Sequence, residues 1–229
     1  MQKYFRNKSD SNATNSFANK LRNKRFLHFL SIFENLNEST ILDIGGTELY
    51  WENRGFIGKG KTIIIVNWIP IKTKNQNIHS VVADARNLSM FKDKSIDIVY
   101  SNSVIEHLGS FEGQKEMANE IRRTAKRYYV QTPCFYFPLE PHFLFPFFQF
   151  FPVCVRVFLV MKFSLGWYQK FTSKSEAFNA VNNIRLLKKK ELKTLFPGSI
   201  IYFEKFFGMT KSYVVVKDSS FTVEEMSYE

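Results

Sequence analysis

The sequence predicts a single α/β domain built on a mostly parallel, seven-stranded sheet with helices on both faces. Short apolar runs alternate with helical patterns through the first part of the chain, which is the order expected of a covered parallel sheet. Two further runs near the C-terminus are joined by a short turn containing glycine, so they form an antiparallel hairpin on the same sheet. A length of 229 residues suits one domain with a sizeable core.

The elements follow one another in a regular order. A helical pattern begins at Ser16, where Phe17 and Leu21 lie on one face. Apolar and β-branched runs bounded by turn residues predict buried strands at residues 40–44, 62–66, 80–82, 96–100 and 128–132. Helical patterns predict helices near residues 104–108, 114–124 and 188–195. The hairpin strands are predicted at residues 200–206 and 212–216.

Composition sets the expected limits of the domain. Residues 1–13 are polar and are predicted to be disordered, residues 14–217 form the domain, and residues 218–229 form an acidic tail. Residues 138–170 are predicted to be a helical insertion after the fifth strand, unusually rich in the chain's 25 phenylalanines. Its prolines and polar residues argue against a transmembrane span. Three alternatives stay open for it: a lid over a substrate, a membrane contact and a dimer surface.

Charge and cysteine content limit the environment and the partners. The net charge of +11 favours nucleic acid, anionic lipid or a phosphate-bearing substrate as partner. Cys134 and Cys154 provide neither a disulfide framework nor the spacing of a metal site, so no metal is expected. The polar N-terminus lacks a signal-peptide core. A cytoplasmic protein is therefore expected, either free or at the inner face of the membrane.

Functional residues are expected at the carboxyl ends of the parallel strands, where ligands bind in open sheets of this kind. The first strand ends in Asp43, followed by Gly45, Gly46 and Thr47, and glycines let the backbone approach a ligand closely. The remaining strand ends contribute Asn67, Asp84, Ala85, Ser101, Ser103, Glu106 and His107. Asn67 stands where nucleotide-binding folds place the side chain that binds ribose.

The order of these segments resembles the class I S-adenosylmethionine-dependent methyltransferases, most closely the type 11 group. Residues 41–45, 83–85 and 97–107 carry the resemblance, and the C-terminal hairpin also matches that family's sheet. The resemblance implies a Rossmann-like fold and S-adenosylmethionine as cofactor. It further implies that Asp43, Gly45 and Gly46 surround the amino-acid end of that molecule.

The resemblance also implies roles for the later strand ends. Asp84 would accept a hydrogen bond from the adenine amino group, Ala85 would donate its backbone N–H, and Ser101 to Ser103 would line the pocket floor. Two departures stand beside these roles. Thr47 replaces a glycine of the family's loop, and Asn67 replaces an acidic residue with an amide that has only one acceptor oxygen. These departures support the alternative of a catalytically silent subunit that binds a partner through the Phe-rich surface.

The methyl acceptor is predicted to be a hydroxyl group on a glycan, a lipid-linked intermediate or a small molecule. A hydroxyl acceptor requires a base, and the candidates are Glu106, His107 and His142. Methylation of nucleic-acid bases is disfavoured because residues 101–104 lack the Asn/Asp-Pro-Pro-aromatic motif, so nucleic acid is not expected as a partner. The alternative enzyme acts on an apolar, quinone-like molecule. A second copy of the chain is expected as a protein partner of the enzyme, and anionic membrane as a peripheral contact.

Overall fold

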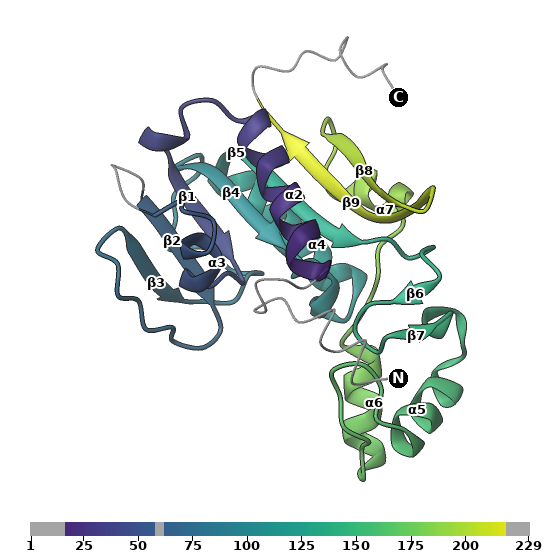
Figure 1. The fold of residues 1–229 in the computed structure, drawn as a ribbon. Coiled ribbons are helices and arrows are strands. Elements are labelled where there is room, and N and C mark those ends of the chain that lie inside the picture. Colours follow the sequence, from purple (N-terminus) through teal and green to yellow (C-terminus); the bar gives the residue numbers. More distant parts are fainter. Residues whose placement is uncertain (1–16, 58–61, 219–229) are drawn as a thin grey trace.

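The structure, a computed structural model, describes residues 17–57 and 62–218, and its centre is a seven-stranded sheet (Figure 1). The strands lie in the order β3-β2-β1-β4-β5-β9-β8. Their bounds are β1 (Thr40–Ile44), β2 (Thr62–Asn67), β3 (Ile78–Val82), β4 (Ile96–Asn102), β5 (Ala125–Pro133), β8 (Ile200–Phe206) and β9 (Met209–Lys217). The predicted disorder of residues 1–13 and nearly all of the predicted acidic tail fall outside the described residues.

Strands β1 to β5 run parallel to one another and β9 runs in the opposite direction, which confirms the predicted, mostly parallel fold class. The pairs β1–β2, β1–β4, β2–β3 and β4–β5 are parallel, and β9 joins β5 in antiparallel register. The hairpin of β8 and β9 closes that side of the sheet. The strand order reverses at β1, which pairs with β2 on one side and with β4 on the other. Open α/β sheets bind ligands at such a point, in the crevice beyond the carboxyl ends of the two strands, here β1 and β4.

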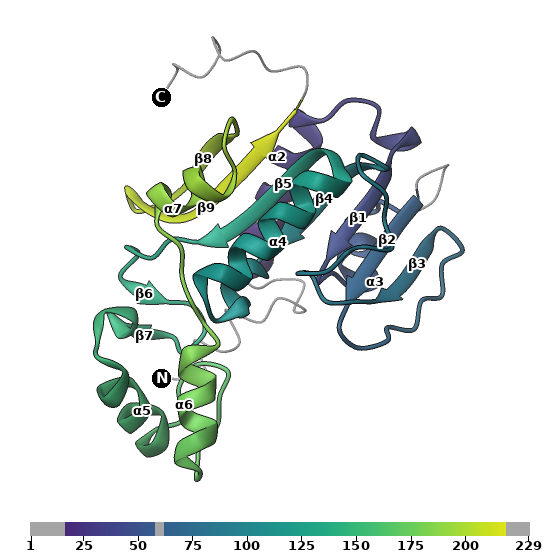
Figure 2. The same cartoon turned by 180° about the vertical axis from the view of Figure 1, so that it is seen from behind.

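Helices cover both faces of the sheet (Figures 1 and 2). One face packs against α2 (Phe17–Ile32) and α3 (Glu48–Glu52), whose buried aromatic side chains Phe26, Phe29 and Trp51 meet the sheet. The other face packs against α4 (Phe111–Thr124) and α7 (Lys189–Leu195). The short helices η1 (Leu36–Glu38) and η2 (Ile105–Leu108) complete the connections. Burial on both faces explains why the central strands β1, β2 and β4 are largely apolar.

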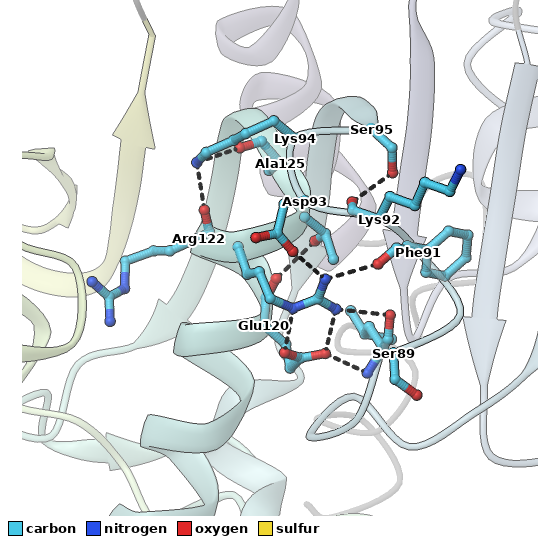
Figure 3. Close-up of polar contacts among 12 residues, drawn as sticks. Ser89, Phe91, Lys92, Asp93, Lys94, Ser95, Glu120, Arg122 and Ala125 are labelled. Atoms are coloured by element: carbon cyan, nitrogen blue, oxygen red, sulfur yellow. Dashed lines mark hydrogen bonds and ion pairs between the residues drawn. The ribbon is translucent and has the colours of Figure 1, made fainter.

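A network of charged groups holds the connection between β3 and β4 against the end of α4 (Figure 3). Arg123 pairs with Glu120 and with Asp93, at 2.8 Å in each case, and also donates to the carbonyl oxygen of Phe91. Lys94 donates from Nζ to two carbonyl oxygens at the end of the same helix. This network anchors the segment that follows the third strand, which carries several of the predicted cofactor residues.

The predicted insertion has a hydrophobic core of its own. It contains β6 (Leu139–Glu140), β7 (Phe145–Pro146), η3 (Phe148–Phe150) and α5 (Val153–Lys162), and α6 (Lys174–Asn182) packs against α5. Both views place these elements beyond the end of β5, to one side of the sheet (Figures 1 and 2). The core extends to Leu186, past the predicted limit at residue 170, and the domain limits themselves stay a prediction. No helix in the described residues is long and apolar enough to cross a membrane.

Candidate functional site

A cavity of about 320 Å³ opens at the carboxyl ends of β1 and β4. It brings together the residues that follow β1, the end of β4, and the helices α2 and α3. Its lining consists of Arg22, Asp43, Ile44, Gly45, Gly46, Thr47, Leu49, Tyr50, Asn53, Arg54, Tyr100 and Asn102. Four of the predicted cofactor residues, Asp43 and the three that form the turn after β1, therefore line one cavity.

Asp43 is the buried acidic group of this cavity. Its side chain is 2% exposed, and the indole Nε1–H of Trp51 donates to its Oδ2 at 2.7 Å. Burial raises the pKa of Asp43 to about 7, and the hydrogen bond from Trp51 only partly opposes this rise. The carboxyl group is therefore poised to change its charge near neutral pH.

The two glycines after β1 are required by close packing. A Cβ on Gly46 would lie 1.7 Å from Oδ2 of Asp43. Gly45 has a φ of 74°, in the left-handed region that favours glycine, and a Cβ there would lie 2.5 Å from Cγ2 of Val104. The turn can therefore wrap closely around Asp43 and present its backbone to the cavity.

Two basic residues line the cavity, Arg22 of α2 and Arg54 just after α3, and Arg25 lies close by on α2; the sequence reasoning did not assign them to the site. Arg25 is buried, pairs with Glu204 at 2.7 Å and donates to Oδ1 of Asn102. Arg54 lies over the ring of Tyr50 at 3.8 Å. Arg22 has no hydrogen-bond or ion-pair partner within residues 17–57 and 62–218, and burial, followed by the charge of Arg25, lowers its pKa. The basic run on α2 was visible in the sequence, but nothing local placed it at this cavity.

The five other predicted cofactor residues, Asn67, Asp84, Ala85, Ser101 and Ser103, lie outside this cavity lining. Oδ1 of Asn67 accepts from the backbone N–H of Trp68. Asp84 is half exposed and pairs with Arg86 at 2.6 Å, and hydrogen bonds from Arg86 lower the pKa of Asp84. Ala85 packs against the sheet's hydrophobic cluster. Their roles toward a ribose and an adenine stay predictions.

The two predicted serines differ in their surroundings. Ser101 is fully buried in β4, and its Oγ has no hydrogen-bond partner among the described residues. Ser103 has a φ of 59°, and its Oγ donates to Oε1 of Gln131 at 2.8 Å. Ser103 therefore fixes the exit of the chain from β4 against the neighbouring strand.

The three predicted catalytic residues lie together beside the exits of β4 and β5. Glu106 is fully buried; Oγ1 of Thr132 donates to its Oε2 at 3.0 Å, while its Oε1 has no hydrogen-bond partner among the described residues. Nε2 of His142 lies 4.0 Å from that Oε1. The rings of His107 and His142 meet edge to face, with centroids 4.7 Å apart.

Glu140, which the sequence reasoning did not single out, holds His142 in place. Nδ1 of His142 lies 2.7 Å from Oε1 of Glu140. The other oxygen of Glu140 accepts from the backbone N–H groups of His142 and Phe143, at 2.8 and 2.7 Å. The Glu-Pro-His sequence contained this short-range pairing, because a carboxylate two residues before a histidine can reach its ring.

Burial and neighbouring charges set the protonation of this group. Burial raises the pKa of Glu106. Burial alone would lower the pKa of His142, but the hydrogen bond and charge of Glu140, and then the charge of Glu106, raise it. Loss of surrounding water, followed by the nearby His142, lowers the pKa of His107 to about 4, so its imidazole is neutral at pH 7.

A second cavity, of about 280 Å³, lies between the sheet domain and the insertion. Aromatic side chains line it together with basic and polar ones: Phe135, Phe143, Phe148, Glu140, Gln149, Arg156, Arg185 and Lys188. Two buried atoms of this lining, Oε1 of Gln149 and Nε of Arg156, have no hydrogen-bond partner among the described residues. Because Glu140 belongs both to this lining and to the group around His142, the cavity adjoins the predicted catalytic residues.

Comparisons with known proteins agree with the resemblance read from the sequence. Residues 66–128 match the family model described as a methyltransferase domain. The solved structure of a SAM-dependent methyltransferase from Methanosarcina mazei is 14% identical to the chain, with a TM-score of 0.51, and the alignment covers 82% of this chain and 94% of that one. The CurJ carbon methyltransferase is 9% identical with a TM-score of 0.50, covering 86% and 53%. No curated protein matches the chain.

Proposed function

We propose that this chain is a class I S-adenosylmethionine-dependent methyltransferase and that it transfers the methyl group to a hydroxyl oxygen, a proposal that its matched methyltransferase domain and its fold support. The observation that supports this acceptor is the buried Oε1 of Glu106, which has no hydrogen-bond partner among the described residues and lies beside His107 and His142. A carboxylate oxygen and a neutral imidazole are hydrogen-bond acceptors, so they suit a group that brings an O–H to the site. A purely apolar acceptor would offer no hydrogen bond to these atoms, so the buried Oε1 of Glu106 would stay without a partner.

The cavity at β1 and β4 fits the amino-acid end of the cofactor. The guanidinium of Arg22, which has no partner among the described residues, would bind its carboxylate, and the carboxylate of Asp43 would bind its ammonium group. The backbone of Gly45 and Gly46 provides the close approach that a ligand in this turn needs. When bound, S-adenosylmethionine supplies a methyl group on a positively charged sulfur.

The chain's own residues would position the acceptor and keep water away. Glu106 is fixed by Thr132, and His142 is fixed by Glu140, so their free atoms keep one geometry without an acceptor present. Such preorganisation favours methyl transfer, because a displacement at carbon needs the attacking oxygen in line with the bond that breaks. The insertion contributes His142 and shields this group from solvent on one side.

The second cavity supports a glycan or lipid-linked acceptor that carries a phosphate group. Its phenylalanines offer faces on which a sugar ring can pack, while Arg156 and Lys188 offer positive charge, since Arg185 already pairs with Glu191 of the same lining. A neutral, quinone-like acceptor would use the aromatic faces and leave the basic groups unused. Charge reversal at Lys188 therefore separates the two: it should weaken an anionic acceptor strongly and a neutral one little.

The first experiment is calorimetric titration of the protein with S-adenosylhomocysteine, the product left after methyl transfer. We expect saturable binding, and Arg22→Ala should weaken it about tenfold through loss of a charge-assisted hydrogen bond. Lys20→Ala, an exposed change on the same helix, is the matched control and should leave the affinity unchanged. Absence of binding to folded wild-type protein would contradict the proposal and favour the silent subunit, which Asn67 and Thr47 would then explain.

The acceptor class needs a second assay. Protein that binds the cofactor should be offered pairs of acceptors that differ only in a free or a methylated hydroxyl group, with radiolabelled methyl donor. Incorporation into the free-hydroxyl member alone supports methylation on oxygen. Equal incorporation into both members would place the methyl group elsewhere and refute the oxygen acceptor.

A further inference from the structure

The group formed by Glu106, His107 and His142 has the composition of a metal site. Each residue offers one ligand atom, and these three atoms lie within 4.8 Å of one another. Two imidazoles and one carboxylate are a ligand set that proteins use for zinc and for other divalent transition metals. Zinc and similar ions bind such mixed sets, whereas magnesium prefers oxygen ligands and its own water.

The distance between the His142 and Glu106 ligand atoms fits a pair of metal ligands better than a directly hydrogen-bonded ion pair. Nε2 of His142 and Oε1 of Glu106 are 4.0 Å apart, which is beyond hydrogen-bonding range. Two ligands about 2.1 Å from a tetrahedral zinc ion lie roughly 3.4 Å from each other. Closing this gap by about half an ångström would satisfy the ion, and the ring of His107 already lies against that of His142, with its ligand atom within 4.8 Å of the other two.

The atoms that would bind the ion are the ones that lack other partners. Oε1 of Glu106 is buried without a hydrogen bond, although such an atom normally has one. His107 has no side-chain hydrogen bond among the described residues. The remaining ligand, Nε2 of His142, lies on the ring edge opposite the nitrogen that contacts Glu140.

The supporting contacts are also those expected around a bound metal. A histidine that binds zinc usually donates its other ring N–H to a carboxylate, which fixes the ring and its tautomer. Glu140 has this relation to His142, at 2.7 Å, and is itself held by two backbone N–H groups. Thr132 likewise occupies one oxygen of Glu106 and leaves the other free.

We propose that Glu106, His107 and His142 bind a divalent transition-metal ion, with Zn²⁺ as the first choice, and that Glu140 orients His142 from outside the site. This proposal differs from the sequence-based expectation of no metal, which considered only the two cysteines. Three protein ligands leave a coordination position open, as in zinc sites that bind a substrate or water. That position would bind an acceptor oxygen, and this last step alone rests on the proposed methylation of a hydroxyl.

The test is metal binding by tag-free protein, measured without any methyl-transfer assay. After exhaustive chelation and dialysis, Zn²⁺ is titrated by calorimetry, and Co²⁺ is added separately to record the visible absorption of a coordinated ion. We expect one ion per chain. His107→Asn, His142→Gln and Glu106→Gln should each lower the Zn²⁺ affinity by about 100-fold or more, and Glu140→Gln by about 10- to 100-fold.

His79→Ala is the matched control, because His79 is an exposed histidine on β3, remote in sequence from the three ligands. It should leave Zn²⁺ binding unchanged. Titration of every variant with S-adenosylhomocysteine reports separately on the cofactor cavity and on folding. Wild-type protein that binds S-adenosylhomocysteine but no Zn²⁺ overturns the metal site and leaves the methyltransferase proposal standing. Wild-type protein that binds Zn²⁺ but not S-adenosylhomocysteine contradicts the methyltransferase proposal and leaves the metal site standing. Zn²⁺ affinity that is unchanged in all the ligand variants also overturns the proposed site.

Discussion

Replacing Asp43 with asparagine should stabilise the protein, and more so at high pH than at low pH. Asparagine has the same shape and can still accept the hydrogen bond from Trp51, but it carries no charge. The pKa of Asp43 is about 7 in the folded protein, against an ordinary value of 3.8 for an aspartate exposed to water. The folded state therefore binds more protons than the unfolded state between these values, so the stability of the wild type falls as the pH rises through this window.

The magnitude follows from the shift. A rise of about three pKa units corresponds to roughly 4 kcal/mol of stability lost once Asp43 is ionised in both states. About 2 kcal/mol of this loss is already present at pH 5, because the unfolded group has ionised there, and the whole loss is present at pH 8. The advantage of Asp43→Asn over the wild type should therefore grow by about 2 kcal/mol between pH 5 and pH 8.

Urea denaturation at pH 5, 6.5 and 8 measures this difference. Asp97→Asn is a control of opposite sign, because contacts with Lys126 and Thr40 outweigh burial and lower the pKa of Asp97. Its carboxylate contributes stability above its unfolded pKa and loses it only as the pH falls through its folded pKa. The Asp97→Asn variant should therefore be less stable than the wild type by a constant amount from pH 5 to pH 8. A pH-independent effect of Asp43→Asn would refute the account of its burial.

Three further predictions test the turn, the insertion and its surface. Gly46→Ala should lower the free energy of unfolding, measured by urea denaturation, by about 1–3 kcal/mol and weaken S-adenosylhomocysteine binding, because its Cβ would displace the Asp43 carboxylate. Gly55→Ala is the control: it has open space around it, so it should cost about 1 kcal/mol for its positive φ and leave binding intact. Phe143→Ala should cost about 3–5 kcal/mol and raise hydrogen exchange in α5 and α6 before the sheet, whereas a uniform rise would contradict a separate core. The exposed Phe158, beside Lys162, should help the insertion bind anionic vesicles at low salt, so Phe158→Ser should reduce flotation; a wild type that never floats would exclude membrane contact.

The sheet could be predicted from the sequence because its strands are covered on both faces. Such strands need apolar, β-branched residues at every position, and these runs are visible without knowledge of their partners. The insertion was visible for a similar reason, since its phenylalanines exceed what a small sheet can bury. Its true extent was not, because α6 is largely polar and joins the insertion only through a few buried residues such as Ala177 and Val181.

The cofactor cavity was predictable where the signal is local. Asp43 and the two glycines are neighbours in sequence, and their packing needs no distant residue beyond Val104. Arg22 could not be found in this way, because only the packing of α2 across the sheet brings it to the cavity. Asp84 shows the opposite problem: its motif is local, but so is the competing pair with Arg86, two residues away.

The group around Glu106 shows why distances between loop residues need the whole fold. Parallel pairing places Asn102 beside Gln131, so the residues leaving β4 and β5 emerge next to each other. This explains why Glu106 reaches Thr132, but His142 lies ten residues further along and is held by Glu140, which binds the backbone of Phe143 in the insertion's core. The core of the insertion therefore sets the position of a candidate catalytic and metal-binding side chain. Its phenylalanines are part of the site's architecture, whatever else their exposed neighbours contact.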